Sequence, residues 1–289
     1  MDEMYGGIEF GGTKTICAIG SQEGEITAKV TIPTTTVEST LGAVYDFFKN
    51  QSPIKALGIG SFGPLNINSQ SEDYGSIYNA PKSGWTNVNL RGLLSNQFNV
   101  PIYFDTDVNC SALGELYFGV VKEVSNFAYL TLGTGIGGSL IIERQLVHGI
   151  LNLEMGHMRI PHEDFKNGFK GACNFHGDCL EGIAGGYAMQ QHYGKRAEEI
   201  ESIEAWDLEA NHIAIALNNI IMAAGPEKIV LGGGLVHRNG LIEEVRSKLA
   251  SIINDYLPIP DINSYIVASS GDTNGVLGAI MLAAKFRNS

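Results

Sequence analysis

The sequence predicts an α/β protein made of two related halves, and three observations support this. Short β-rich runs alternate along the chain with segments whose apolar residues recur at helical spacing. The runs IEFGGTKTICAIG and LTLGTGIGGSLII each have the pattern strand, glycine turn and strand, and they start about half a chain apart. No low-complexity linker separates the halves. We therefore expect two related domains that share an interface with a cleft.

In the first half, Gly11 and Gly12 form the predicted turn between two strands, and EITAKVTIPTTT is a third strand. The segment STLGAVYDFFKNQ predicts a helix capped by Ser39 and Thr40. A further strand, within IKALGIGSFGPLNI, ends in a glycine–proline loop. The run NVPIYFDTDVNCSALGELYFG then predicts a strand, an acidic loop and a helix.

The second half repeats the opening pattern in NFAYLTLGTGIGGSLIIERQLVHG. Helices are predicted near 186–193 and over 205–224, where Gly225 and Pro226 stop the longer one. The run EKIVLGGGL is a buried strand, and NGLIEEVRSKLASIINDYL is an amphipathic helix. The run DINSYIVASSGDTNGVLGAIMLAAK supplies a strand, a glycine loop and the final helix.

Charge and composition exclude several classes of partner. The 289 residues include 31 acidic and 19 basic ones, for a formal net charge of -12, whereas a nucleic-acid-binding protein needs a basic face. No stretch approaches the roughly 20 apolar residues of a membrane span, and the N-terminus lacks the pattern of a signal peptide. We expect no nucleic-acid or membrane partner. Four cysteines without a secretion signal favour the cytoplasm, where clustered cysteines more often bind metal than form disulfides.

Three glycine loops follow predicted strands, at 11–14, 133–135 and 232–234. The run GTGIGG matches a dinucleotide-binding motif, but a strand follows it instead of a helix, and GGTKT lacks the P-loop pattern. Each loop alone is compatible with an ordinary hairpin turn. Together they favour phosphate binding, because backbone N–H groups of glycines can approach an anion closely. Two hairpins would hold a triphosphate, helped by Lys14, and the third loop would lie beneath a nucleoside.

Acidic and amide side chains precede the helix of the first half, at Asp105, Asp107 and Asn109. In phosphoryl transfer a carboxylate takes the proton of the attacking hydroxyl, and Asp107 is our candidate for this general base. The competing interpretation is helix capping, which Asp and Asn commonly perform, and for Asn109 it is the favoured one.

The run GACNFHGDCLEG places Cys173, His176 and Cys179 in one glycine-rich loop. Structural zinc takes four Cys and His ligands, so a fourth must come from elsewhere, and His157 and His162 are the nearest candidates. The same spacing is compatible with two buried thiols and a surface histidine. Cys17 and Cys110 fit small core residues, and Trp85 and Trp206 fit packing aromatics.

The runs IEFGGTK, IGSFGP, APKSGW, FDTDVNCSALGE, LGTGIGG, LEMGH, the Cys/His loop and VLGGGL carry a family resemblance in this order. The chain resembles ROK-family sugar kinases and, among them, zinc-containing bacterial fructokinases. The resemblance implies an actin-like ATPase (ribonuclease H-like) fold, with two domains around a cleft and frequent dimerisation. It places the N-terminal domain at 1–118, joined by the final helix at about 275–289, and the C-terminal domain with its zinc loop at 119–274.

The resemblance also implies residue roles. Asp107 matches the catalytic base, and His157 joins Cys173, His176 and Cys179 as the fourth zinc ligand while also meeting the sugar. The expected sugar-binding residues are Gly63, Pro64, Lys82, Asn109, Glu154, His157 and Glu181. The expected residues for ATP and its Mg²⁺ are Glu9, Gly11, Gly12, Thr13, Lys14, Gly133, Thr134, Gly135, Gly185, Gly232, Gly233, Gly234 and Leu235.

Three positions depart from the family pattern. Glu9 stands where most members have Asp, and its longer side chain fits a role toward metal-bound water. Thr106 replaces an Asn that contacts sugar in glucose-type members, which weakens the case for glucose. Gly186 stands where Pro is usual after Gly185.

The expected activity is transfer of the γ-phosphate of ATP to the 6-hydroxyl of fructose by a homodimer, with Mg²⁺ and structural zinc. Alternative substrates are mannose, glucose and N-acetylmannosamine. A sugar-responsive regulator is disfavoured, because the first strand begins within about eight residues of Met1 and leaves no room for a helix-turn-helix before it. A non-catalytic sugar-binding protein remains a further alternative.

Overall fold

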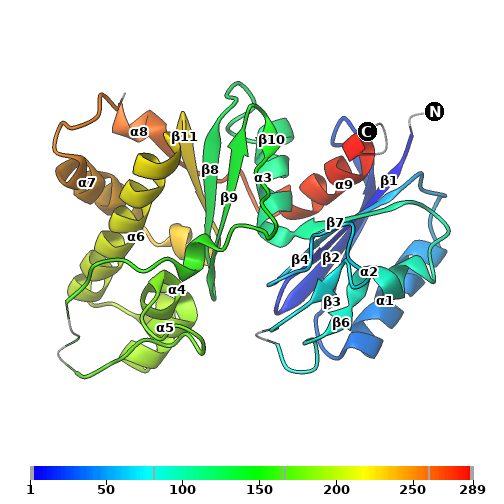
Figure 1. Ribbon diagram of the computed structural model, residues 1–289, viewed down its shortest axis with the longest axis horizontal. Coiled ribbons are helices and arrows are strands. Elements are labelled where there is room, and N and C mark those ends of the chain that lie inside the picture. The colour runs from blue at the N-terminus through cyan, green and yellow to red at the C-terminus, as the bar shows by residue number, and fades with distance from the viewer. Residues whose placement is uncertain (1–2, 81, 164, 166, 260, 287–289) are drawn as a thin grey trace. The chain divides into compact units, whose positions relative to one another are not determined.

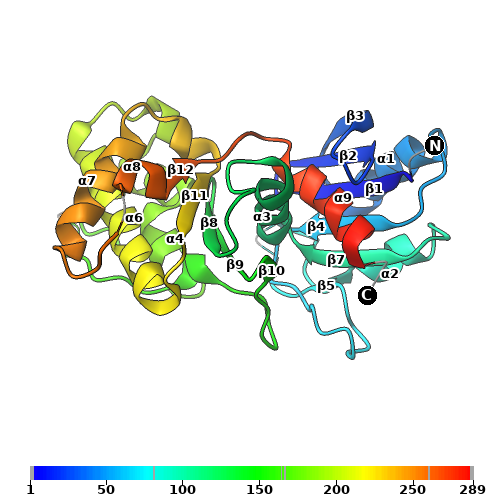
Figure 2. The ribbon, with the colours of Figure 1, turned by 90° about the horizontal axis from the view of Figure 1, so that it is seen from above.

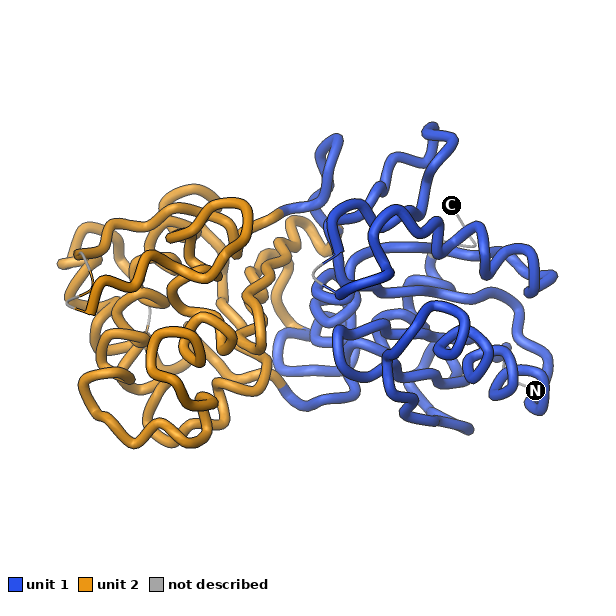
Figure 3. The backbone as a smooth tube through the Cα atoms, turned by 90° about the horizontal axis from the view of Figure 1, so that it is seen from below, with its two compact units in different colours: residues 1–122, 146–153, 270–289 blue, residues 123–145, 154–269 orange. Residues whose placement is uncertain are grey.

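The computed structural model describes residues 3–80, 82–163, 165, 167–259 and 261–286. The chain divides into two compact units (Figure 3). Unit 1 comprises residues 1–122, 146–153 and 270–289, and unit 2 comprises residues 123–145 and 154–269. Each unit is built on its own five-stranded sheet.

The sheet of unit 1 has the order β3-β2-β1-β4-β7 (Figure 1). Strand β1 pairs antiparallel with β2 and parallel with β4, and β4 pairs parallel with β7. Alternate residues of β2 point to opposite faces, with Cys17 and Ile19 in one apolar cluster and Ile16 and Ala18 in the other. Both faces of the sheet are therefore covered. The strands are β1 (Tyr5–Phe10), β2 (Lys14–Gly20), β3 (Ile26–Pro33), β4 (Leu57–Ser61) and β7 (Ile102–Thr106).

Helices cover the two faces of this sheet. On one face pack α1 (Val37–Lys49) and α2 (Leu90–Ser95), through residues such as Val44. On the other face lies α9 (Asn274–Phe286), packed against α3 (Asp107–Phe118) and along the sheet (Figure 2). The two helices approach closely because a Cβ at Gly278 would lie 1.6 Å from the carbonyl oxygen of Cys110.

Unit 2 repeats the arrangement with a sheet of order β10-β9-β8-β11-β12. Strands β8 and β9 form an antiparallel hairpin, and β11 pairs parallel with both β8 and β12. The predicted repeat of strand, glycine turn and strand is therefore confirmed. The strands are β8 (Phe127–Leu132), β9 (Ile136–Ile142), β10 (Gln145–Leu146), β11 (Lys228–Gly232) and β12 (Ile266–Ala268).

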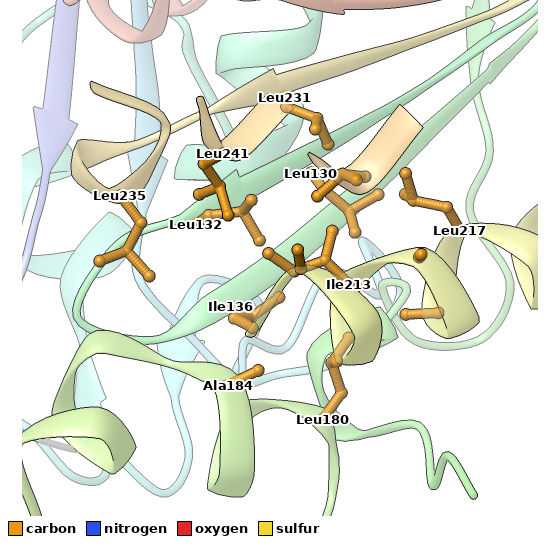
Figure 4. Packing of buried hydrophobic residues seen from close by; sticks show 14 of the residues in the cluster. Leu130, Leu132, Ile136, Leu180, Ala184, Ile213, Leu217, Leu231, Leu235 and Leu241 are labelled. Carbon is orange, nitrogen blue, oxygen red and sulfur yellow. The ribbon is translucent and has the colours of Figure 1, made fainter. Parts of the chain in front are cut away.

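The core of unit 2 forms between its sheet and the apolar faces of its helices (Figure 4). Leu130 and Leu231 of the sheet and Ile213 and Leu217 of α6 belong to this cluster. The helices are α4 (Leu180–Ala184), α5 (Gly186–Tyr193), α6 (Ile203–Ala224), α7 (Leu241–Ile253) and α8 (Ile262–Tyr265). Three short 3-10 turns, at Met155–His157, Ala197–Glu199 and Gly234–His237, and a two-stranded sheet of β5 (Ser76–Ile77) and β6 (Val88–Asn89) complete the described elements.

Two local predictions are wrong. Helix α1 begins at Val37, because Thr36 is the N-cap and its hydroxyl accepts a hydrogen bond from the Ser39 N–H, which leaves Ser39 and Thr40 inside the helix. The predicted acidic loop is absent, since β7 runs to Thr106 and α3 begins at the next residue. Residues 287–289 of the predicted final helix, and Pro81 of the APKSGW segment, lie outside the described residues.

No helix among the described residues combines the length and apolar character needed to cross a membrane. Cys17 and Cys110 are fully buried, as predicted for small core residues.

Candidate functional site

In unit 1, the first glycine turn carries exposed backbone groups beside a buried carboxylate. Gly12 and Thr13 are exposed between β1 and β2, and the Gly11 N–H closes the turn on the Lys14 carbonyl at 3.0 Å. Glu9, in β1, has a buried oxygen, Oε2, with no hydrogen-bond partner in the described part of the chain. Burial, followed by the negative charge of Asp107, raises the pKa of Glu9 to about 7, against the lowering effect of Lys14. A cation bound at this carboxylate would stabilise its ionised form and so lower its pKa, against the effects of burial and of the Asp107 charge.

Asp107 is the first residue of α3, and its Oδ1 accepts a hydrogen bond from the Val108 N–H at 2.9 Å. The N-cap of this helix is Thr106, whose hydroxyl accepts from the Asn109 N–H at 3.0 Å. The capping interpretation of Asn109 is therefore wrong. Its side chain instead donates from Nδ2 to Asp105 at 2.6 Å.

Asp105 and His148 form a pair that the sequence interpretation did not identify. Asp105 is the last but one residue of β7 and is 4% exposed, and its Oδ2 lies 2.8 Å from His148 Nε2. His148 follows β10, 43 residues along the chain. No motif or spacing marks this histidine, so only the tertiary structure identifies it.

Other predicted residues of unit 1 lie near the same turn or at the end of β4. The Lys82 ammonium donates to the Gly12 carbonyl at 3.0 Å, which ties the APKSGW segment to the first glycine turn. Gly63 and Pro64 follow β4 and are half-buried. Trp85 is fully buried, and its Nε1–H donates to the Thr35 carbonyl at 2.9 Å, so it packs as predicted for a core aromatic.

In unit 2, the second and third glycine loops contribute to one pocket of about 820 Å³. This volume suits a small-molecule ligand. Four of the predicted residues line it: Gly133, Thr134, Gly234 and Leu235. The start of α5 packs on the second loop, because the N–H groups of Gly186 and Tyr187 donate to the carbonyls of Gly133 and Thr134, at 2.8 and 2.9 Å.

Residues that the sequence did not mark, including Tyr187, Arg196 and Arg238, also line this pocket. Trp206, predicted as a packing aromatic, is 4% exposed in the core of unit 2 and borders the pocket as well. The Arg238 guanidinium lies 5.3 Å from the centre of the Trp206 ring, within cation–π range. Gly233 has φ of 87°, and a Cβ there would lie 2.4 Å from the Leu132 carbonyl oxygen, so the third loop requires glycine. Gly232 ends β11, Gly135 ends the second turn, and Gly185 is buried before α5.

A second site in unit 2 gathers His157, Cys173, His176 and Cys179, whose ligand atoms all lie within 4.8 Å of one another. His157 Nδ1 is 3.3 Å from His176 Nδ1, 3.5 Å from Cys179 Sγ and 3.7 Å from Cys173 Sγ. A tetrahedral zinc ion would require about 3.3 Å between two nitrogens and about 3.6 Å between nitrogen and sulfur. The four residues therefore fit zinc. His162 instead lies 3.5 Å from Asp178.

The remaining two predicted sugar-binding residues also belong to unit 2. Glu154 is exposed, directly before the 3-10 turn that carries His157. Glu181 is in the first turn of α4, and its Oε2 accepts a hydrogen bond from the Ile136 N–H at 2.9 Å. This bond fixes the carboxylate beside the second glycine turn.

Comparisons with known proteins agree on one family. The ROK family model matches residues 5–286. A fructokinase of Pediococcus pentosaceus is 40% identical, with 97% of each chain covered, and one of Streptococcus mutans is 42% identical, with 99% of each covered. The crystal structure of a ROK family glucokinase from Streptomyces griseus, in complex with glucose and AMPPNP, aligns with a TM-score of 0.79 at 21% identity, over 98% of this chain and 99% of that one. This chain therefore has the same fold as that glucokinase, as the sequence predicts.

Proposed function

Because the chain belongs to the ROK family and has fructokinase relatives at about 40% identity, it is an ATP-dependent sugar kinase, and we propose that it phosphorylates fructose at the 6-hydroxyl. The observation that carries the proposal is the grouping of Asp107, Glu9 and Lys14 in unit 1. Asp107 at the start of α3 and Lys14 after the first glycine turn lie close enough to Glu9 for their charges to change its pKa. Phosphoryl transfer requires groups of these kinds: a base (Asp107), a carboxylate suited to a metal ion or its water ligands (Glu9), and a cation beside the phosphates (Lys14).

Asp107 is the proposed general base. Its carboxylate would accept the proton of the sugar hydroxyl as that oxygen attacks the γ-phosphate, and the ADP oxygen would leave on the opposite side. Lys14 and the exposed N–H groups of the first turn would stabilise the charge of the transferred group. Mg²⁺, when bound, would neutralise part of the phosphate charge, and the unpaired Oε2 of Glu9 suits an ion or its water ligands.

The pocket of unit 2 would bind the nucleoside of ATP. The second glycine loop, at 133–135, would offer N–H groups to the phosphates. Gly234 and Leu235 would border the nucleoside. Trp206 and Arg238 would contribute a flat, polarizable wall of the kind that suits a purine base.

The proposed sugar-binding residues are Gly63, Pro64, Lys82, Asn109, Glu154, His157 and Glu181. In the proposed zinc site, His157 uses Nδ1, which leaves Nε2 to meet a sugar hydroxyl. Zinc would thereby orient the imidazole and take no part in the chemistry. The relatives' names favour fructose over mannose, glucose or N-acetylmannosamine.

The test is ADP release with MgATP and a panel of fructose, mannose, glucose and N-acetylmannosamine. We expect the highest kcat/KM with fructose. Preference for another sugar would keep the kinase mechanism and refute the substrate. A folded, zinc-loaded sample without turnover on any of the four would favour a non-catalytic sugar-binding protein.

A further inference from the structure

The segment 146–153 belongs to a different unit from the residues on either side of it in the sequence. Residues up to 145 and from 154 belong to unit 2, whereas this segment packs with unit 1 (Figure 3). The side chain of His148 makes one polar contact of this segment with the rest of unit 1, because its Nε2 lies 2.8 Å from the buried Asp105 carboxylate. The histidine ring is about one third exposed, and the Asp105 side chain is 5% exposed.

Asp105 accepts three hydrogen bonds, and their directions follow from its charge. Its Oδ1 accepts from the Thr106 N–H at 2.7 Å and from Asn109 Nδ2 at 2.6 Å, while Oδ2 faces His148 Nε2. Since a carboxylate only accepts, His148 presents Nε2–H and Asn109 presents its NH₂ group. The 3.3 Å separation between His148 Nε2 and Asn109 Nδ2 is therefore a convergence of two donors on one acceptor.

This arrangement fixes the orientation of the Asn109 side chain. With NH₂ directed at Asp105, the Asn109 amide offers its carbonyl oxygen on the side away from that carboxylate. Asn109 is 3% exposed, and under the proposed function this oxygen would accept a hydrogen bond from a sugar hydroxyl. Removing the His148 donor would free Oδ2 of a buried carboxylate, and the Asn109 NH₂ could then turn toward either oxygen.

We propose that His148 is a positioning residue for sugar binding, which acts through Asp105 to hold the Asn109 side chain in the orientation that accepts a hydroxyl hydrogen bond. The inference rests on the proposed function, because it assigns Asn109 to the sugar. It names the interaction by which the 146–153 segment takes part in substrate selection.

The experiment compares H148A, H148Q and the control H192Q. Alanine removes the donor, whereas glutamine keeps an N–H group at about the same distance from the backbone. His192 is also a partly exposed histidine, and it packs on Phe169 in unit 2. Steady-state kinetics would give the KM values for sugar and ATP, and calorimetry would give the Kd for the sugar alone.

We expect H148A to raise the sugar KM and Kd by up to about tenfold, the cost of one neutral hydrogen bond between Asn109 and the sugar, with the ATP KM changed less than twofold. H148Q should recover most of the sugar affinity, and H192Q should match the wild type. An unchanged sugar KM in H148A, or an equal loss in H148A and H148Q, would overturn the inference while leaving the kinase assignment intact.

If H148A does not unfold cooperatively, D105A decides the matter. Alanine at position 105 removes the acceptor of both donors, so the sugar KM must again rise, and an unchanged value would refute the role of the pair. Absence of wild-type turnover on every sugar would refute the proposed function first, and the inference with it.

Discussion

Replacing Glu9 by Gln is expected to stabilise the protein while it removes activity. Burial and the Asp107 charge raise the pKa of Glu9 from 4.5 to about 7. At pH 8 Glu9 is therefore mostly ionised, although its surroundings in the folded protein favour the neutral acid. Each pKa unit corresponds to about 1.4 kcal/mol, and a difference of 2.5 between the two pKa values therefore costs about 3 kcal/mol of unfolding free energy above pH 7. Neutral Gln avoids this cost.

The pH dependence has a definite sign. A carboxyl group whose folded pKa is raised contributes its stabilisation below about pH 4.5, and that contribution is lost as the pH rises through 7. The stability gain of E9Q over the wild type should therefore grow by about 2 to 3 kcal/mol between pH 5 and pH 8, and then level off.

The assay is urea denaturation of both proteins at several pH values without magnesium, followed by ADP release with MgATP. The exposed residue Glu72 gives the control E72Q, for which no pH-dependent difference is expected. We expect E9Q to lose most of its turnover, because the neutral amide would hold Mg²⁺ or its water ligands less well than the carboxylate does. A stability difference that does not change between pH 5 and pH 8 would refute the reasoning about Glu9.

Three further outcomes are expected. D107N should lower kcat by about 10²- to 10⁴-fold with little change in sugar KM, and retained kcat would exclude Asp107 as the base. C173S should release the bound zinc, measured by elemental analysis, and lower Tm by about 10 °C, since metal affinity adds to folding stability; a full zinc content would contradict the proposed ligand set. R238A should raise the ATP KM by about three- to tenfold without changing the sugar KM, because Arg238 packs on Trp206 in the pocket of unit 2, and an altered sugar KM alone would contradict that placement.

Much of the fold is predictable because local patterns report the burial of each face. The run ICAI at 16–19 is apolar at every position, which is typical of a strand covered on both faces, and the structure places Cys17 and Ile19 in one apolar cluster and Ile16 and Ala18 in the other. The end of α6 was equally clear, since Gly225 adopts a left-handed conformation with φ of 53° at the C-cap. The start of α1 was not, because several Ser and Thr residues in TTTVEST can cap a helix and the chain uses Thr36.

The site was predictable only where its residues lie in short motifs. The ligand atoms of Cys173, His176 and Cys179 come together as their spacing predicts, and tertiary structure adds His157 rather than His162. The contact between Asp105 and His148 spans 43 residues, and neither residue lies in a pattern that links it to the other. Interactions of this kind depend on how the elements pack, so a single sequence carries no signal for them.

The positions of the candidate residues follow from sheet topology. In unit 1, β1, β4 and β7 run parallel, so their carboxyl ends meet at one edge of the sheet, where the glycine turn, the Gly63–Pro64 loop and Asp107 follow them. In unit 2, β8 and β11 are also parallel, and the second and third glycine loops follow their carboxyl ends. Parallel α/β sheets bind ligands at this edge because helix N-termini and free backbone N–H groups collect there. Each unit therefore has an edge of the kind that suits an anion, and the two acidic residues that we propose for phosphoryl transfer, Glu9 and Asp107, lie at the edge of unit 1.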